Sequence, residues 1–231
     1  MNIIHVEWWE RLVHWMRVLK QELYEPLGEI SWEACRTKEQ LSMEKALTGD
    51  FIPVSQGFTW GEQWEYCWFK GSIVLPKEAE GKRIVLNLEP GGESTLFVNG
   101  KSFGTYRSDQ VAPIHEKHHY FEDNILTREA KAGEQFQIVM ETYAGHYYPE
   151  PVIGCAYGPV IPGMYENTLP EGARRTLGKC TYGIWNEDAY QLYMDVETLM
   201  KLFDTLDDTS LRAAKIAEAL EQFTLIVDFE Q

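Results

Sequence analysis

The sequence has few basic residues for its length. Its 231 residues include 21 lysines and arginines against 36 aspartates and glutamates, which gives a formal net charge of −15. A surface with this excess of negative charge repels nucleic-acid phosphates and anionic lipid headgroups. We therefore expect neither a nucleic acid nor a membrane as a partner.

Long hydrophobic runs are also missing. No apolar stretch approaches the roughly 20 residues that are needed to span a bilayer. The N-terminal segment carries Glu7, Glu10 and Arg11 where a signal peptide would have an uncharged core. These absences predict a soluble, cytoplasmic protein.

Cysteine is scarce and widely spaced. The 4 cysteines are Cys35, Cys67, Cys155 and Cys180, and no two of them form a C-x-x-C pair. This spacing favours neither a zinc knuckle nor a disulfide scaffold. Isolated thiols of a reducing cytoplasm are the expected interpretation.

Signatures of catalysis are missing too. The sequence has no glycine-rich phosphate loop and no G-x-S-x-G elbow. The segment HEKHH does place His115, Glu116 and His119 in an H-E-x-x-H pattern, which binds zinc when it lies on a helix. Pro113 and strand-like flanks favour a loop instead, so we predict no catalytic residue and no metal site here. A zinc hydrolase stays as an alternative.

What the chain has in abundance is apolar and aromatic residues arranged in three regions. Residues 1–50 are predicted to form a helical preface, because apolar residues recur at helical spacing from Ile4 to Tyr24. A weaker helix is expected from Trp32 to Leu47, with Ser31 as its N-cap.

Residues 51–160 have the short alternating runs of a β-sandwich. Their clearest signal is STLFVNGKSFG, because Asn99-Gly100 supplies the positive φ angles that a tight hairpin turn demands. Residues 161–231 are predicted to form an irregular connector followed by two helices. Asn186 is the expected N-cap of the first helix. The fold class is therefore mainly β, with helices at both ends.

The motifs in this order resemble the region that precedes the catalytic domain in family 38 α-mannosidases. The resemblance rests on FTWGEQWEYCWFKGSIVLP, LEPGGESTLFVNGKSFGTYRSDQ and METYAG, and on the helical stretch that begins at WNEDAYQLYM. It implies a jelly-roll, galactose-binding-like β-sandwich and a helical linker towards a missing catalytic domain. The V-N-G-K feature is similar to jelly rolls of other glycoside hydrolases as well.

The resemblance also implies a function. The parent protein would hydrolyse α-linked mannose with a zinc ion held by a His-x-His-x-Asp segment, which this chain lacks. The chain would then be an accessory domain, inactive alone, whose partner is the catalytic domain of the same polypeptide. Mannosides and a second copy of the chain are further candidate partners. The alternative is a stand-alone carbohydrate-binding module.

A sugar site on the sandwich would need aromatic rings and hydroxyl acceptors. The candidate stacking rings are Trp60, Trp64, Tyr143 and Tyr147, and the candidate acceptors are Glu93 and Asp109. Core packing is the favoured role for the tryptophan cluster, since alternation along YCWFKG must bury at least one large ring. For Glu93, a bond to the sandwich backbone is favoured over contact with a sugar.

Overall fold

The computed structural model describes residues 3–62, 64–107, 125–144, 175–207 and 209–226. The chain forms two compact units, which are described separately below. One comprises Pro26–Gly183, and the other combines Met1–Glu25 with Ile184–Gln231.

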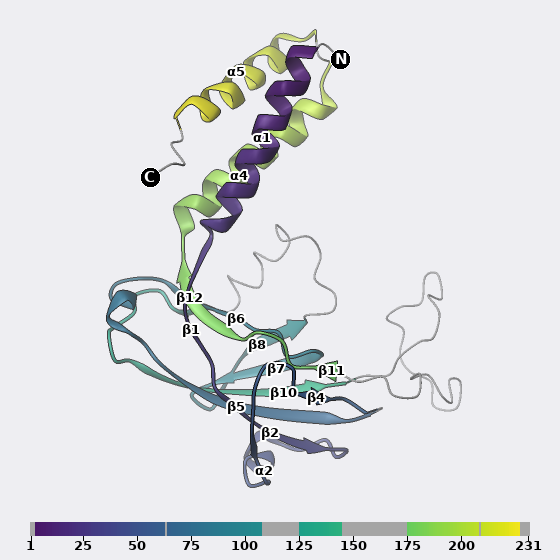
Figure 1. The fold of residues 1–231 in the computed structure, drawn as a ribbon, viewed down its shortest axis with the longest axis vertical. Helices are drawn as coiled ribbons and strands as arrows, with labels where there is room; N and C mark the ends of the chain where they lie inside the picture. The colour runs from purple at the N-terminus through teal and green to yellow at the C-terminus, as the bar shows by residue number, and fades with distance from the viewer. Residues whose placement is uncertain (1–2, 63, 108–124, 145–174, 208, 227–231) are drawn as a thin grey trace, which may run out of the picture. The chain divides into compact units, whose positions relative to one another are not determined.

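The larger unit is a β-sandwich (Figure 1). Its six-stranded sheet has the order β3-β2-β5-β10-β7-β8, and a four-stranded sheet has the order β1-β12-β6-β9. The strands of the first sheet are β2 (Trp32–Thr37), β3 (Ile52–Val54), β5 (Tyr66–Val74), β7 (Glu93–Val98), β8 (Lys101–Arg107) and β10 (Gln135–Tyr143). Those of the second are β1 (Tyr24–Glu29), β6 (Ile84–Asn87), β9 (Ile125–Thr127) and β12 (Thr181–Trp185). A two-stranded pair joins β4 (Thr59–Trp60) to β11 (Arg175–Thr176).

Alternation along the strands builds the core. On β5 and β10 one face carries Phe69, Ile73, Ile138 and Met140, all at most 1% exposed. The ring of Trp60 packs edge-on against Phe69 at 5.9 Å between centroids. We call this the inner face of the six-stranded sheet. The mainly β fold with helices at both ends is confirmed.

The hairpin prediction is confirmed in detail. Strands β7 and β8 pair antiparallel around Asn99 and Gly100, whose φ angles are 50° and 75°. Asn99 also accepts a hydrogen bond at Oδ1 from the backbone N–H of Gln137, at 2.9 Å. The turn therefore ties the hairpin to β10.

The predicted helix from Trp32 to Leu47 is wrong. Trp32 begins strand β2, which pairs with β3 on one side and β5 on the other. Burial alternates along it, with Trp32 and Ala34 buried, so cross-strand packing outweighs a weak helical period. The helix that remains is α2 (Met43–Ala46), capped by Ser42 rather than Ser31. The helical preface thus stops before β1.

The region 161–231, predicted as connector and helices, also contributes strands. Within its described part, β11 pairs with β4, and β12 lies between β1 and β6. The HEKHH segment and residues 145–174, which include the end of the predicted sandwich and the start of the predicted connector, lie outside the described residues.

The smaller unit consists of three helices, each in contact with the other two. They are α1 (Ile3–Gln21), α4 (Glu187–Thr205) and α5 (Leu211–Ile226). Leu12 and Leu220 are fully buried, and Trp9 contacts Phe203 at 6.2 Å between ring centroids. The predicted cap is confirmed, because the Asn186 side chain accepts a hydrogen bond from the backbone N–H of Ala189. None of the helices within the described residues is long and apolar enough to cross a bilayer.

Candidate functional site

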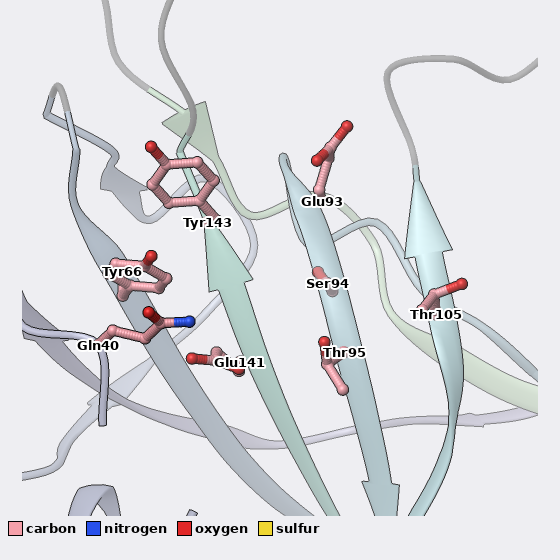
Figure 2. Close-up of a pocket in the computed structure, with 8 residues that line it drawn as sticks. All are labelled: Gln40, Tyr66, Glu93, Ser94, Thr95, Thr105, Glu141 and Tyr143. Atoms are coloured by element: carbon pink, nitrogen blue, oxygen red, sulfur yellow. The ribbon is translucent and has the colours of Figure 1, made fainter. Parts of the chain in front are cut away.

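The face of the six-stranded sheet opposite the core carries a pocket, which we call the outer-face pocket (Figure 2). Its volume is about 460 Å³, within the range typical of sites for small ligands. Strands β5, β10, β7 and β8 supply most of its lining: Tyr66, Glu93, Ser94, Thr95, Thr105, Glu141 and Tyr143. Gln40, from the segment between β2 and α2, completes it.

Strand register brings the main side chains together in two rows. Tyr143 on β10 pairs with Tyr66 on β5 and with Glu93 on β7. In the next row Glu141 pairs with Thr95, which in turn pairs with Thr105 on β8. Directly opposite residues of an antiparallel pair have their Cβ atoms about 5 Å apart. The pocket is therefore fixed by the sheet ladder.

Two stacked tyrosines form an aromatic platform. The rings of Tyr66 and Tyr143 have centroids 4.8 Å apart and planes inclined by 29°, and Figure 2 shows them one above the other beside Gln40. Burial, with smaller contributions from Tyr66 and Glu93, raises the pKa of Tyr143 to about 12. Burial and the nearby Glu141 also raise the pKa of Tyr66. Both phenols therefore stay neutral hydrogen-bond donors at neutral pH.

Glu141 is the most unusual group in the pocket. Its side chain is half-buried, and burial raises the pKa of its carboxyl group. No described residue forms a hydrogen bond or an ion pair with this carboxylate. A partly desolvated carboxylate without a partner is costly to keep, so it marks a place where a ligand could donate hydrogen bonds.

Part of the outer face is covered. Trp68, Val139 and Ala46 are buried there in one cluster, with Leu41 and Met43 packed against it. Helix α2 and its flanking segment cover the sheet at Trp68, and the same segment carries Gln40 to the pocket rim. The pocket therefore borders a packed cluster, whereas the far end of the same face, at Val74, is exposed.

A second polar cluster holds the turn before β5. Glu65 is 5% exposed and accepts hydrogen bonds from Arg36 Nε at 2.8 Å and from the backbone N–H of Gly61 at 2.8 Å and of Glu62 at 2.9 Å. Its carboxylate is therefore fully engaged within the protein, and its role is structural. The turn presents Trp64 with a φ angle of 65° and 43% of its surface exposed.

The structure separates the predicted sugar-binding residues. Trp60 is 0% exposed, so its prediction as a stacking ring is wrong, because both faces of the indole are covered by the core. Trp64 is exposed but does not line the pocket. Asp109 and Tyr147 lie outside the described residues.

Glu93 and Tyr143, which are 50 positions apart in the sequence, are brought together as neighbours in one pocket. Glu93 is exposed there. Whether its carboxylate binds the sandwich backbone or a sugar stays a prediction.

The sequence analysis did not assign Thr95 or Glu141 to a sugar site. Tyr66 belongs to the aromatic run YCWFKG, but nothing in the sequence showed which strands would flank it. The pairing of β10 with both β5 and β7 supplies that information.

Among the described residues, no group of three or more His, Cys, Asp or Glu side chains could hold a metal ion. The described part of the chain therefore does not fit a catalytic zinc site. His115, Glu116 and His119 lie outside the described residues.

These features define a jelly-roll β-sandwich domain with a polar and aromatic pocket on the outer face of one sheet. The sequence model of the family described as "Alpha-mannosidase, jelly roll domain" matches residues 26–157. Because this match covers more than half of the chain, the chain belongs to that family of α-mannosidase jelly-roll domains.

Two curated relatives show weaker similarity. Alpha-mannosidase 2C1 from Mus musculus is 23% identical over 210 residues, which cover 91% of this chain and 19% of the relative. Metalloprotease StcE from Escherichia coli O157:H7 is 25% identical over 114 residues, covering 48% of this chain and 13% of the relative. The chain thus spans a fifth or less of the length of either protein.

Solved structures of a β-glucuronidase from Ruminococcus gnavus align at a low level. The complex with N1-substituted uronic isofagomine gives a TM-score of 0.43 at 14% identity, over 71% of this chain and 30% of that chain. The apo enzyme gives a TM-score of 0.41 at 14% identity, over 70% of this chain and 29% of that chain.

Proposed function

We propose that this chain is the accessory jelly-roll domain of a larger α-mannosidase polypeptide that hydrolyses α-linked mannose. The observation that carries the proposal is the family match over residues 26–157. The mouse relative supports it, because similarity to an α-mannosidase extends over 91% of this chain while covering only 19% of that protein. The greater part of such an enzyme therefore corresponds to sequence outside this chain.

Catalysis in this proposal belongs to a separate domain. Zinc, held by residues outside this chain, would supply Lewis-acid chemistry and anchor the substrate there. The described residues contribute no cluster for it. The sandwich contributes a rigid scaffold that packs on the catalytic domain and shapes the approach to its cleft. The enzyme in this proposal is cytoplasmic, and a second copy of it is a further candidate partner.

The test compares two proteins on an aryl α-mannoside. The first is this chain, and the second is a longer polypeptide in which it is joined to the catalytic region of an α-mannosidase of the same family. We expect hydrolysis only by the longer polypeptide, with loss of activity when metal is chelated and recovery when zinc is restored. Deleting residues 26–183 from it should lower activity or yield of folded enzyme.

Hydrolysis of the mannoside by this chain alone would contradict the proposal. So would full activity and stability of the longer polypeptide after residues 26–183 are removed, because an accessory domain must assist something.

A further inference from the structure

We propose that the outer-face pocket is a saccharide-binding site for a neutral mannoside. Glu141 and Glu93 accept hydrogen bonds from hydroxyl groups of the sugar, and the Tyr66–Tyr143 pair contacts its apolar face. The choice of a mannoside rests on the proposed function, whereas the chemistry of the pocket rests on the residues themselves.

The first reason to expect a ligand is the contrast between two adjacent residues of β10. Thr142 points to the inner face, where its hydroxyl pairs with that of Ser94 at 2.9 Å. Glu141 points to the pocket, and no described residue hydrogen-bonds to its carboxylate although the side chain is half-buried. A partly desolvated carboxylate without a hydrogen-bond donor is costly to keep, and a hydroxyl group of a ligand in the pocket can supply that donor.

The second reason is the mixture of groups around Glu141. The stacked tyrosines offer aromatic surface and neutral phenol donors, and Thr95 and Thr105 add hydroxyls on the adjoining strands. A saccharide presents both an apolar ring face and a set of hydroxyl donors, which these groups match. A purely apolar ligand would leave the Glu141 carboxylate without a hydrogen-bond donor.

Geometry allows one sugar ring to reach both carboxylates. Glu141 pairs with Thr95, and Glu93 lies two residues before Thr95 on β7. Such diagonal neighbours on adjacent strands are about 7–8 Å apart. Long glutamate side chains and the hydroxyls of a single pyranose can span that separation.

The charge of Glu141 disfavours acidic ligands. Among the described residues that line the pocket there is no lysine or arginine to offset this carboxylate. Uronic acids and sugar phosphates would be repelled, because like charges at short range disfavour binding. The pocket therefore selects a neutral saccharide by its hydroxyl groups.

The experiment titrates this chain with methyl α-mannoside and α-mannobiose, by calorimetry and by chemical-shift changes. Millimolar saturable binding is expected, and Glu141→Gln should weaken it at least about tenfold, since a charge-assisted acceptor is lost. Thr95→Val should weaken it less. The matched control Glu78→Gln removes the same charge from an exposed position outside the pocket and should bind like the original chain.

Three results would overturn the proposal. These are no saturable binding of either mannoside, equal binding by the original chain and Glu141→Gln, or an equal loss in Glu78→Gln. Tighter binding of glucuronate than of methyl α-mannoside would also overturn it. If only glucosamine bound, the pocket would be a site for cations and the neutral saccharide would be rejected.

The failure of this inference is distinguishable from failure of the proposed function. Hydrolysis by the longer polypeptide without sugar binding by this chain would reject the pocket alone. Mannoside binding that depends on Glu141, together with a longer polypeptide that hydrolyses nothing, would reject the enzymatic role alone.

Discussion

The two faces of the six-stranded sheet are built from the same strands and differ in the side chains that they carry. On the inner face Phe69 and Met140 are fully buried, and the polar pair Ser94–Thr142 is closed by a hydrogen bond. On the outer face the residues next along the strands include Tyr66, Tyr143 and the unpartnered Glu141. The inner face is packed with apolar side chains that stabilise the fold. The outer face keeps a partly desolvated carboxylate, Glu141, that lowers stability.

This difference indicates where function resides. A half-buried carboxylate that no described residue engages is a departure from local stability of the kind found at binding sites. Glu65 provides the contrasting case to Glu141. It is a buried carboxylate as well, but Arg36 and two backbone N–H groups engage it fully, so no ligand is needed to explain it.

The largest expected effect comes from the inner face. Phe69→Ala should lower the free energy of unfolding by about 3–5 kcal/mol, because it opens a cavity in a fully buried site. Tyr66→Ala, on the outer face of the same strand, should cost about 1 kcal/mol. Urea denaturation of both variants measures the difference. Equal losses of unfolding free energy in the two variants would contradict the distinction between the inner and outer faces.

The second-largest loss of unfolding free energy is expected at Glu65, whose carboxylate is fully hydrogen-bonded within the protein. Glu65→Ala removes the acceptor of Arg36, Gly61 and Glu62, and should cost about 3 kcal/mol because two backbone N–H groups and one guanidinium lose their hydrogen bonds together. Glu62→Ala removes an exposed partner of Arg36 and Lys38 and should cost at most about 1 kcal/mol. Chemical denaturation again provides the measurement, and a similar cost for both would contradict the structural role of Glu65.

Replacing the Glu141 carboxylate should raise the free energy of unfolding instead of lowering it. Glu141→Gln is expected to raise the free energy of unfolding at neutral pH by about 0.5 kcal/mol, since a partly desolvated charge is removed. The measurement is thermal or urea unfolding of the two proteins across a pH series. A destabilised Glu141→Gln variant would show that the carboxylate has a structural partner.

The pH dependence of that gain follows from the raised pKa. A carboxyl group whose pKa is higher in the folded state stabilises the protein fully below its unfolded pKa, and this contribution is lost as pH rises through the folded pKa. The advantage of Glu141→Gln should therefore be small in acid and grow towards neutral pH. Tyr66 and Tyr143 have raised pKa values and stay neutral throughout, and Glu93 is present in both proteins, so its contribution cancels.

Local signals allowed most of the fold to be predicted. The Asn99-Gly100 turn, the Asn186 cap and the alternation around Phe69 each depend on neighbouring residues only, and each is confirmed. The error at Trp32–Leu47 has a different origin. There the residues favour no structure strongly, and pairing with β5, which is distant in sequence, decides for a strand.

The site was harder to predict than the fold because it is defined by register. Glu93 and Tyr143 were proposed separately, as an acceptor and as a ring, and only the pairing of β7 with β10 makes them neighbours. Trp60 was proposed as a stacking ring although core packing was the favoured role of the tryptophan cluster, and its complete burial agrees with core packing. Glu141 gave no sequence signal, because acidic residues are abundant in this chain.

The most direct test of the account asks which face of the sheet responds to a sugar. Methyl α-mannoside would be titrated into protein with labelled methyl groups, and the shifts of Thr95 and Thr105 compared with those of Ile138 and Met140. We predict saturable shifts at both threonines, at the pocket, and none at the buried pair on the inner face. Shifts confined to residues away from the pocket, or no saturable shift at either threonine, would contradict the assignment of function to the outer face.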